Sequence, residues 1–198
     1  MSHYYLNDES LTHDEHILDL KVKDISLRLY TDRGVFSRGG LDFGTKVLLE
    51  SIDLPLASKT IVDMGSGYGP MSIFLAKKYP DKHIFAFDVN ERAVHLTRKN
   101  MKENQVSNVE ANVSFLFENV KVKADVVVTN PPIRAGKQTI FKLYEEAYEN
   151  LNSNGFLYVV IQKKQGAPST YNKLLELFKQ CEVIEKSAGY WVLLAQKV

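Results

Sequence analysis

The alternation of short apolar runs with amphipathic stretches from residue 59 onward constrains the fold of this chain most strongly. We expect strands at 60–64, 83–87, 111–117, 124–129, 156–161, 181–187 and 190–196. We expect helices at about 69–79, 91–104, 137–151 and 168–179. Strands that alternate with helices form a parallel sheet covered on both faces. Only Ala188 and Gly189 separate the last two strands, so these strands must pair antiparallel. The pattern predicts an α/β fold with a doubly wound, seven-stranded, mostly parallel sheet and an antiparallel last strand.

The segment before residue 59 has a different pattern. Residues 17–22 and 25–30 both alternate between apolar and polar side chains, with Lys23 and Asp24 between them, which predicts an N-terminal β-hairpin. A glycine-containing loop follows at 34–40, and Asp42 is a suitable N-cap for a helix at about 44–52. We therefore expect residues 1–58 to form an arm, a hairpin and a helix packed on a single globular unit of residues 59–198.

Composition restricts the class of protein. The chain has 198 residues, of which 44% are hydrophobic and 25% charged, which fits one ordinary globular domain. Its net charge of +1 argues neither for nor against nucleic acid, because a local basic patch is sufficient for binding. Cys181 is the only cysteine, so an internal disulfide or a cysteine-based metal site is excluded. With no signal peptide and no apolar run long enough to cross a bilayer, we expect a cytoplasmic protein without metal or membrane partner.

A glycine-rich loop, Asp63-Met64-Gly65-Ser66-Gly67-Tyr68-Gly69, follows the first predicted sheet strand. Glycines allow a sharp turn and let a ligand approach the backbone. A dinucleotide site has the spacing G-x-G-x-x-G, whereas this loop reads G-x-G-x-G, which counts against a dehydrogenase. Asp63 could pair with a cation such as an aminoacyl ammonium, and Asp88 ends the next strand, where an acid commonly binds ribose hydroxyls. The loop therefore favours a nucleoside that carries an amino-acid end.

A second motif, Asn130-Pro131-Pro132, follows the apolar run 124–129. Ligands of open α/β sheets bind at the carboxyl ends of the strands, so this motif belongs at the site of chemistry. The prolines keep the backbone out of a helix, which leaves its carbonyls free to accept hydrogen bonds. The Asn130 oxygen and the Pro131 carbonyl would form a pair of acceptors suited to a planar –NH2 group. The chain thus has the features of an enzyme that methylates an amino nitrogen.

The two motifs together resemble those of class I S-adenosylmethionine (SAM)-dependent methyltransferases, and Asn130 to Ile133 is similar to the [DNS]-P-P-[YFW] motif of amino-nitrogen methyltransferases. The segments 31–37, 41–45, 130–137 and 162–167 resemble ribosomal RNA small subunit methyltransferase C and its short relatives. The resemblance implies a Rossmann-like fold, SAM as cofactor, and transfer to the exocyclic N2 of a guanine in small-subunit rRNA. It also implies RNA or an assembling small ribosomal subunit as the partner of a monomer or homodimer.

The resemblance and the motifs assign roles to individual residues. The expected catalytic residues are Asn130, Pro131, Pro132 and Ile133. The expected cofactor-binding residues are Phe36, Ser37, Thr45, Asp63, Gly65, Ser66, Gly67, Asp88, Val89, Phe115 and Asn130, of which Phe36, Ser37 and Thr45 would close over the cofactor. A basic rim at the same sheet edge would meet RNA phosphates through Arg134, Lys137 and Lys163.

Two other functions share parts of this pattern. A protein glutamine amide also presents an –NH2 group, but its methyltransferases usually carry an aromatic residue at the position of Ile133. A SAM-binding RNA-assembly module without turnover would keep both loops and lose no activity when Asn130 is replaced. Tyr190 and Trp191, in the last predicted strand, are expected in the core.

Overall fold

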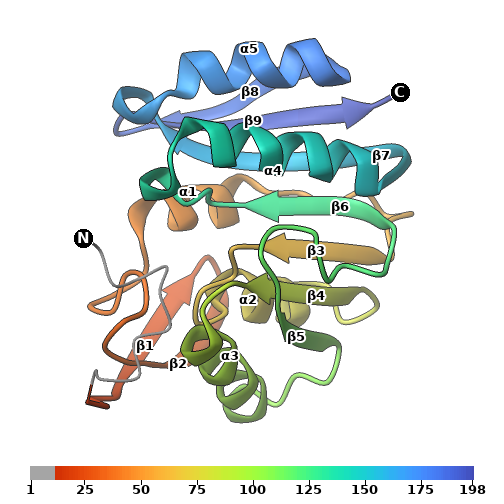
Figure 1. The fold of residues 1–198 in the computed structure, drawn as a ribbon. Helices are drawn as coiled ribbons and strands as arrows, with labels where there is room; N and C mark the ends of the chain where they lie inside the picture. The colour runs from red at the N-terminus through yellow and green to blue at the C-terminus, as the bar shows by residue number, and fades with distance from the viewer. Residues whose placement is uncertain (1–11) are drawn as a thin grey trace.

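The computed structural model describes residues 12–198, so most of the expected N-terminal arm lies outside the described residues. The strands are β1 (His16–Val22), β2 (Ile25–Thr31), β3 (Thr60–Met64), β4 (His83–Asp88), β5 (Val109–Val113), β6 (Ala124–Thr129), β7 (Leu151–Gln162), β8 (Lys179–Ser187) and β9 (Tyr190–Lys197). The α-helices are α1 (Phe43–Ser51), α2 (Pro70–Lys78), α3 (Glu91–Glu103), α4 (Lys137–Asn150) and α5 (Ala167–Phe178). Two short 3-10 helices are η2 (Ile133–Ala135) and η3 (Lys163–Gln165) (Figure 1). Within residues 12–198, no helix has the length and apolar character needed to cross a bilayer.

Seven strands form one sheet in the order β5-β4-β3-β6-β7-β9-β8. The pairs from β5 to β7 are parallel, whereas β9 pairs antiparallel with both β7 and β8. In Figure 1 the arrow of β9 accordingly runs opposite to those of β3, β4 and β6. The turn between β8 and β9 consists of Ala188 and Gly189, which both have positive φ as tight hairpin turns require. The predicted seven-stranded, mostly parallel sheet with one antiparallel strand is confirmed.

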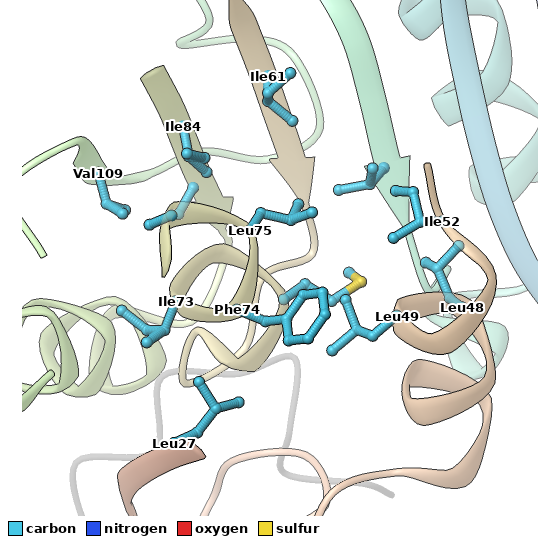
Figure 2. Close-up of a cluster of buried hydrophobic side chains, with 14 of the residues drawn as sticks. Leu27, Leu48, Leu49, Ile52, Ile61, Ile73, Phe74, Leu75, Ile84 and Val109 are labelled. Atoms are coloured by element: carbon cyan, nitrogen blue, oxygen red, sulfur yellow. The ribbon is translucent and has the colours of Figure 1, made fainter. Parts of the chain in front are cut away.

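Successive residues of the central strands face opposite sides of the sheet, and each side has its own apolar core. Ile61 packs with α1, α2, α3 and the hairpin on one side, whereas the adjacent Val62 packs with α4 and α5 on the other. Figure 2 shows the first cluster, in which Phe74 of α2 lies near Leu49 of α1 and Leu27 of β2 lies below α2. A strand buried on both faces favours apolar residues at successive positions, which explains the three consecutive valines, Val126 to Val128, in β6.

The predicted N-terminal hairpin forms as β1 and β2, which pair antiparallel from His16↔Thr31 to Val22↔Ile25. Two asparagines one helical turn apart, Asn100 of α3 and Asn104 at its C-cap, hold the other edge of β2. The Asn100 side chain accepts from Tyr30 N (2.6 Å) and donates to Tyr30 O (3.0 Å). Asn104 does the same with the N–H and C=O of Arg28, at 3.1 and 2.7 Å. These amides replace a neighbouring strand, so β2 does not leave an open hydrogen-bonding edge.

One predicted strand is misplaced. The expected strand at 111–117 occupies Val109–Val113, and the chain then turns at Ser114. The Ser114 hydroxyl donates to Leu116 O (2.7 Å) and accepts from Asn119 N (3.0 Å). A side chain that satisfies backbone groups locally removes them from the ladder, and this turn ends the strand. Phe115 therefore lies in a loop beyond the sheet edge rather than within a strand.

Candidate active site

A cleft of about 520 Å³ lies at the carboxyl ends of β3, β4 and β6. Its walls also include the loop around Phe36, the start of α1 and the start of β9. This is where ligands bind in open α/β sheets, and the size suits a nucleoside-containing ligand. The residues expected from the sequence that line it are Phe36, Ser37, Thr45, Gly65, Ser66, Gly67, Asp88, Val89, Phe115, Asn130, Pro131, Pro132, Ile133 and Arg134.

Three expected site residues lie outside this lining. The Asp63 side chain is 0% exposed and lies behind the glycine loop, where its Oδ2 accepts from the Ser72 hydroxyl (2.6 Å). Burial raises the pKa of the Asp63 carboxyl to about 7, and the negative charge of Asp88 adds to this shift. Its other oxygen, Oδ1, is buried without a hydrogen-bond partner among the described residues, and the expected pairing with an aminoacyl ammonium stays a prediction. Lys137 and Lys163 are exposed at the starts of α4 and η3.

The glycine loop is held tightly between β4 and α3. Gly65 and Gly67 have φ of 76° and 57°, a conformation that other residues adopt only with strain. The backbone N–H groups of Gly65 and Ser66 donate to Phe87 O, at 2.8 and 3.0 Å. Behind the loop, a Cβ on Gly69 would lie 2.8 Å from Thr97 Cγ2. Glycine is thus needed both for the turn itself and for the close contact with α3.

Asp88 is buried at the end of β4 with both carboxylate oxygens directed by backbone groups. Oδ2 accepts from Gly67 N and Oδ1 from Asn90 N, each at 2.8 Å. Burial raises the pKa of Asp88, while these N–H groups and that of Val89 oppose the shift by stabilising the charged form. Each oxygen retains acceptor capacity, so the carboxylate is oriented to receive two neighbouring hydroxyl groups, as on a ribose.

Asn130 is held by two acceptors that belong to the start of α1. Its Nδ2 donates to Asp42 Oδ2 (2.8 Å) and to Thr45 Oγ1 (3.0 Å). Because a carboxylate can only accept, the partner of Asp42 must be the –NH2 of the amide and not its oxygen. The Asn130 Oδ1 is therefore the atom left to accept a hydrogen bond from a ligand. The Asn130 amide is therefore oriented to accept a hydrogen bond from an –NH2 group.

Sequence reasoning missed two residues of this site. Asp42 was expected only to cap a helix, and it does accept from Thr45 N (2.9 Å), but the same oxygen also holds Asn130. Tyr190 was expected in the core, and its half-buried side chain does pack against the core cluster that contains α1, but it also lines the cleft. Burial raises the pKa of Tyr190, and the charge of nearby Asp42 acts in the same direction. The signal for Tyr190 was its place just after the last hairpin turn, because an antiparallel strand begins where its parallel neighbours end.

The cleft fits SAM, the cofactor that the resemblance implies. The Ser66 hydroxyl is buried without a hydrogen-bond partner among the described residues, so a polar ligand group would satisfy it. Asp88 would bind the ribose hydroxyls, and Phe115 with Val89 would contact the adenine, while Phe36 and Ser37 lie at the same cleft. When bound, SAM supplies an electrophilic methyl group on a sulfonium leaving group. Within residues 12–198, no three His, Cys, Asp or Glu side chains are grouped to hold a metal ion.

Comparisons with known proteins agree with this geometry. The family model described as "Methyltransferase small domain" matches residues 26–194. The chain is 40% identical over 198 residues to "Uncharacterized protein YbxB" of Bacillus subtilis, covering 99% of this chain and 98% of that protein. It is 30% identical over 183 residues to "Ribosomal RNA small subunit methyltransferase C" of Acinetobacter baylyi, covering 89% of this chain and 53% of the relative. The chain therefore spans about half the length of that relative.

A solved structure shares the fold. It is described as a T. thermophilus 16S rRNA N2 G1207 methyltransferase in complex with AdoMet and guanosine, and it superposes with a TM-score of 0.82 at 23% identity. The match covers 93% of this chain and 51% of that one. The family match extends over both the glycine loop and the Asn-Pro-Pro motif. The chain belongs to the methyltransferase small domain family and is a class I SAM-dependent methyltransferase.

Proposed function

We propose that this enzyme methylates the exocyclic N2 of a guanine in small-subunit rRNA, acting on RNA or on an assembling small ribosomal subunit in the cytoplasm. The observation that carries the proposal is the orientation of the Asn130 side-chain amide. Its –NH2 is bound by Asp42 and Thr45, so its Oδ1 is left to accept from a substrate –NH2 group, and Pro131, whose carbonyl would be the second acceptor, lines the same cleft. In this proposal, the loop and helix that contain Phe36, Ser37 and Thr45 close over the cofactor bound to the domain of residues 59–198.

The acceptor pair addresses the chemical difficulty of the reaction. The lone pair of a guanine amino group is delocalised into the ring, which makes the nitrogen a poor nucleophile. Hydrogen bonds from its two N–H groups to Asn130 Oδ1 and the Pro131 carbonyl favour a pyramidal nitrogen with its lone pair aimed at the methyl group. The N–C bond forms as the C–S bond breaks, and the methylated nitrogen then releases a proton to water. Positioning and oriented dipoles thus supply the catalysis.

The basic side chains near the cleft favour RNA as the acceptor. Arg134 lines the cleft, and Lys137 is exposed at the start of α4, both directly after the catalytic loop. Lys163 and Lys164 are exposed in η3, which follows the carboxyl end of the neighbouring strand β7. Four cationic groups at one sheet edge would contact the phosphates that flank a target base. The name of the Acinetobacter relative agrees with this assignment.

The test is methylation with methyl-labelled SAM of unmodified small ribosomal subunits and of naked small-subunit rRNA. We expect label in N2-methylguanosine after nuclease digestion. Asn130→Ala should lower the rate by about 10²–10³-fold, the usual cost of removing one preorganised hydrogen-bonding group. Asn152→Ala is the matched control, because this exposed asparagine bonds only Asp125 Oδ1 at the opposite end of the sheet. Label in a protein glutamine, or SAM binding without turnover, would contradict the proposal.

A further inference from the structure

We infer that Tyr190, buttressed by Phe43, is the stacking face for the target base of this enzyme. The inference rests on the proposed function and deepens it, because it names the residue that holds the ring of the base. In the motif of amino-nitrogen methyltransferases, the position after the two prolines carries an aromatic residue. Here that position is Ile133, which offers no aromatic face.

The topology places Tyr190 on the side of the cleft where a substrate would bind. Asp88, the last residue of β4, and Phe115, which follows β5, are the groups expected to bind the cofactor, and both strands lie on one side of β3 in the sheet. Asn130 follows β6, on the other side of β3, and β9 lies two strands further along. Tyr190 is the first residue of β9 and pairs with Gln162 at the carboxyl end of β7. Its side chain lines the same cleft as Asn130 and the residues that follow it.

The ring of Tyr190 and the carboxylate that holds Asn130 both lie next to Gly44. A Cβ built on Gly44 would lie 2.7 Å from Tyr190 Cε1 and 3.1 Å from Asp42 Oδ2. The phenol ring and the Asp42 carboxylate therefore flank one point, and that carboxylate bonds the Asn130 amide. Glycine within a helix costs roughly 1 kcal/mol relative to alanine. Its presence in α1 matches the need to seat the ring of Tyr190 at this point.

Phe43 supports the ring from the outside. Its ring centroid lies 5.6 Å from that of Tyr190, with an interplanar angle of 52°. Tilted pairs at this separation stabilise one another beyond the burial of apolar area. Phe43 is nevertheless 43% exposed, although it is the first residue of a helix whose inner face is apolar. A large aromatic group in this position holds Tyr190 in place without being part of the core itself.

If the Tyr190 ring stacks on the base, the loss of its ring should matter, whereas the loss of its hydroxyl should not. Stacking of a base on an aromatic side chain is sequence-tolerant and depends on the ring, not on the hydroxyl. Tyr190→Phe should therefore keep the KM for the RNA within about twofold of wild type. Tyr190→Leu, which keeps apolar volume but no ring, should lower kcat/KM for the RNA by about 5- to 150-fold, the range expected for loss of one stacked base. Phe43→Leu should produce a smaller loss in the same direction.

Spectroscopy provides the direct readout. In an RNA substrate whose target guanine is replaced by 2-aminopurine, the base keeps its 2-amino group and is fluorescent when unstacked. We expect the complexes of wild type and Tyr190→Phe to remain quenched and that of Tyr190→Leu to be bright. The dissociation constant of SAM should stay within about twofold in every variant, which shows that the cleft is intact. If Tyr190→Leu were to fail to fold, the same measurements on Phe43→Leu against wild type would test the inference.

Two results would overturn the inference, and each differs from failure of the proposed function alone. If wild type methylates guanine N2 and Tyr190→Leu does so with unchanged kcat/KM and unchanged quenching, the stacking role is wrong while the proposed function stands. If the methyl acceptor is a glutamine amide, both fail, because an amide has no ring to stack.

Discussion

Replacing Asp42 by serine separates the two interactions that its carboxylate makes. Oδ2 of Asp42 accepts from Thr45 N at the start of α1 (2.9 Å) and from Asn130 Nδ2 (2.8 Å). Serine is as good an N-cap as aspartate, so the helix start should be retained. The shorter side chain cannot reach Asn130, whose amide would then be held only by Thr45 Oγ1. The amide could turn over and present –NH2 to a substrate –NH2 group, which cannot accept it.

The expected loss of kcat follows from the hydrogen bond between Asn130 and Asp42 that the substitution removes. A hydrogen bond to a charged group contributes about 1.5–3 kcal/mol. If that energy orients Asn130 in the transition state, its loss lowers kcat by roughly 10- to 150-fold. Asp42→Ala should show the same loss of kcat, and in addition a loss of about 0.5–2 kcal/mol of folding stability because the cap is removed. Asp42→Ser should unfold near the wild-type midpoint.

The assay is single-turnover methylation of the small-subunit RNA with saturating SAM, together with urea unfolding of each variant. Asp42→Ser and Asp42→Ala should be equally slow and differ in stability, and the KM for SAM should change little. Wild-type kcat in Asp42→Ser would refute the reasoning, because Asn130 would then need no acceptor at position 42. A kcat that followed stability across the two variants would refute it as well.

Three further outcomes are expected. Asp88→Asn should raise the dissociation constant of SAM by about tenfold or more in calorimetry, because the carboxylate loses acceptor capacity toward Gly67 N and the ribose. The folded-state pKa of Asp63, about 7 against 3.8, means that the folded protein binds the extra proton between these pH values. The contribution of Asp63 to stability is therefore greatest below about pH 4 and falls toward pH 7, by at most about 1.4 kcal/mol per pH unit. Asp63→Asn should lack this slope in unfolding titrations, and an identical slope would contradict the burial argument. Gly69→Ala should lose roughly 2 kcal/mol or more, through its positive φ and the 2.8 Å contact with Thr97 Cγ2. Adding Thr97→Ser, which removes that methyl group, should recover part of the loss in denaturant unfolding.

The sheet was predictable because its signals are local. The apolar run at 124–129, with three consecutive valines, indicates a strand buried on both faces, and it forms β6. The two-residue link at Ala188 and Gly189 requires an antiparallel pair, and β8 and β9 form one. The strand at 111–117 was misplaced because apolar residues continue beyond Val113, whereas a Ser114 side-chain hydrogen bond ends the ladder there. Periodicity does not report such a competing bond.

The Asn-Pro-Pro and glycine motifs likewise placed most expected site residues at the cleft, because each motif sits at the end of a parallel strand and such ends share one edge. Asp63, Lys137 and Lys163 lie outside the lining of the cleft. For Asp63 the sequence pattern does not report the contact with Ser72 of α2, which binds one of its two carboxylate oxygens.

The sequence by itself determined the order of strands and helices, the glycine loop and the catalytic loop, because periodicity and turn chemistry depend on near neighbours. Only the tertiary structure decided which atom of the Asn130 amide is presented to the cleft. That choice depends on Asp42, which lies 88 residues away in the chain. The same holds for Tyr190, which the reversed direction of β9 brings to the carboxyl ends of the parallel strands. Hydrogen bonds and ring contacts act over a few ångströms in space, so residues remote in sequence acquire a shared role only when the sheet has assembled.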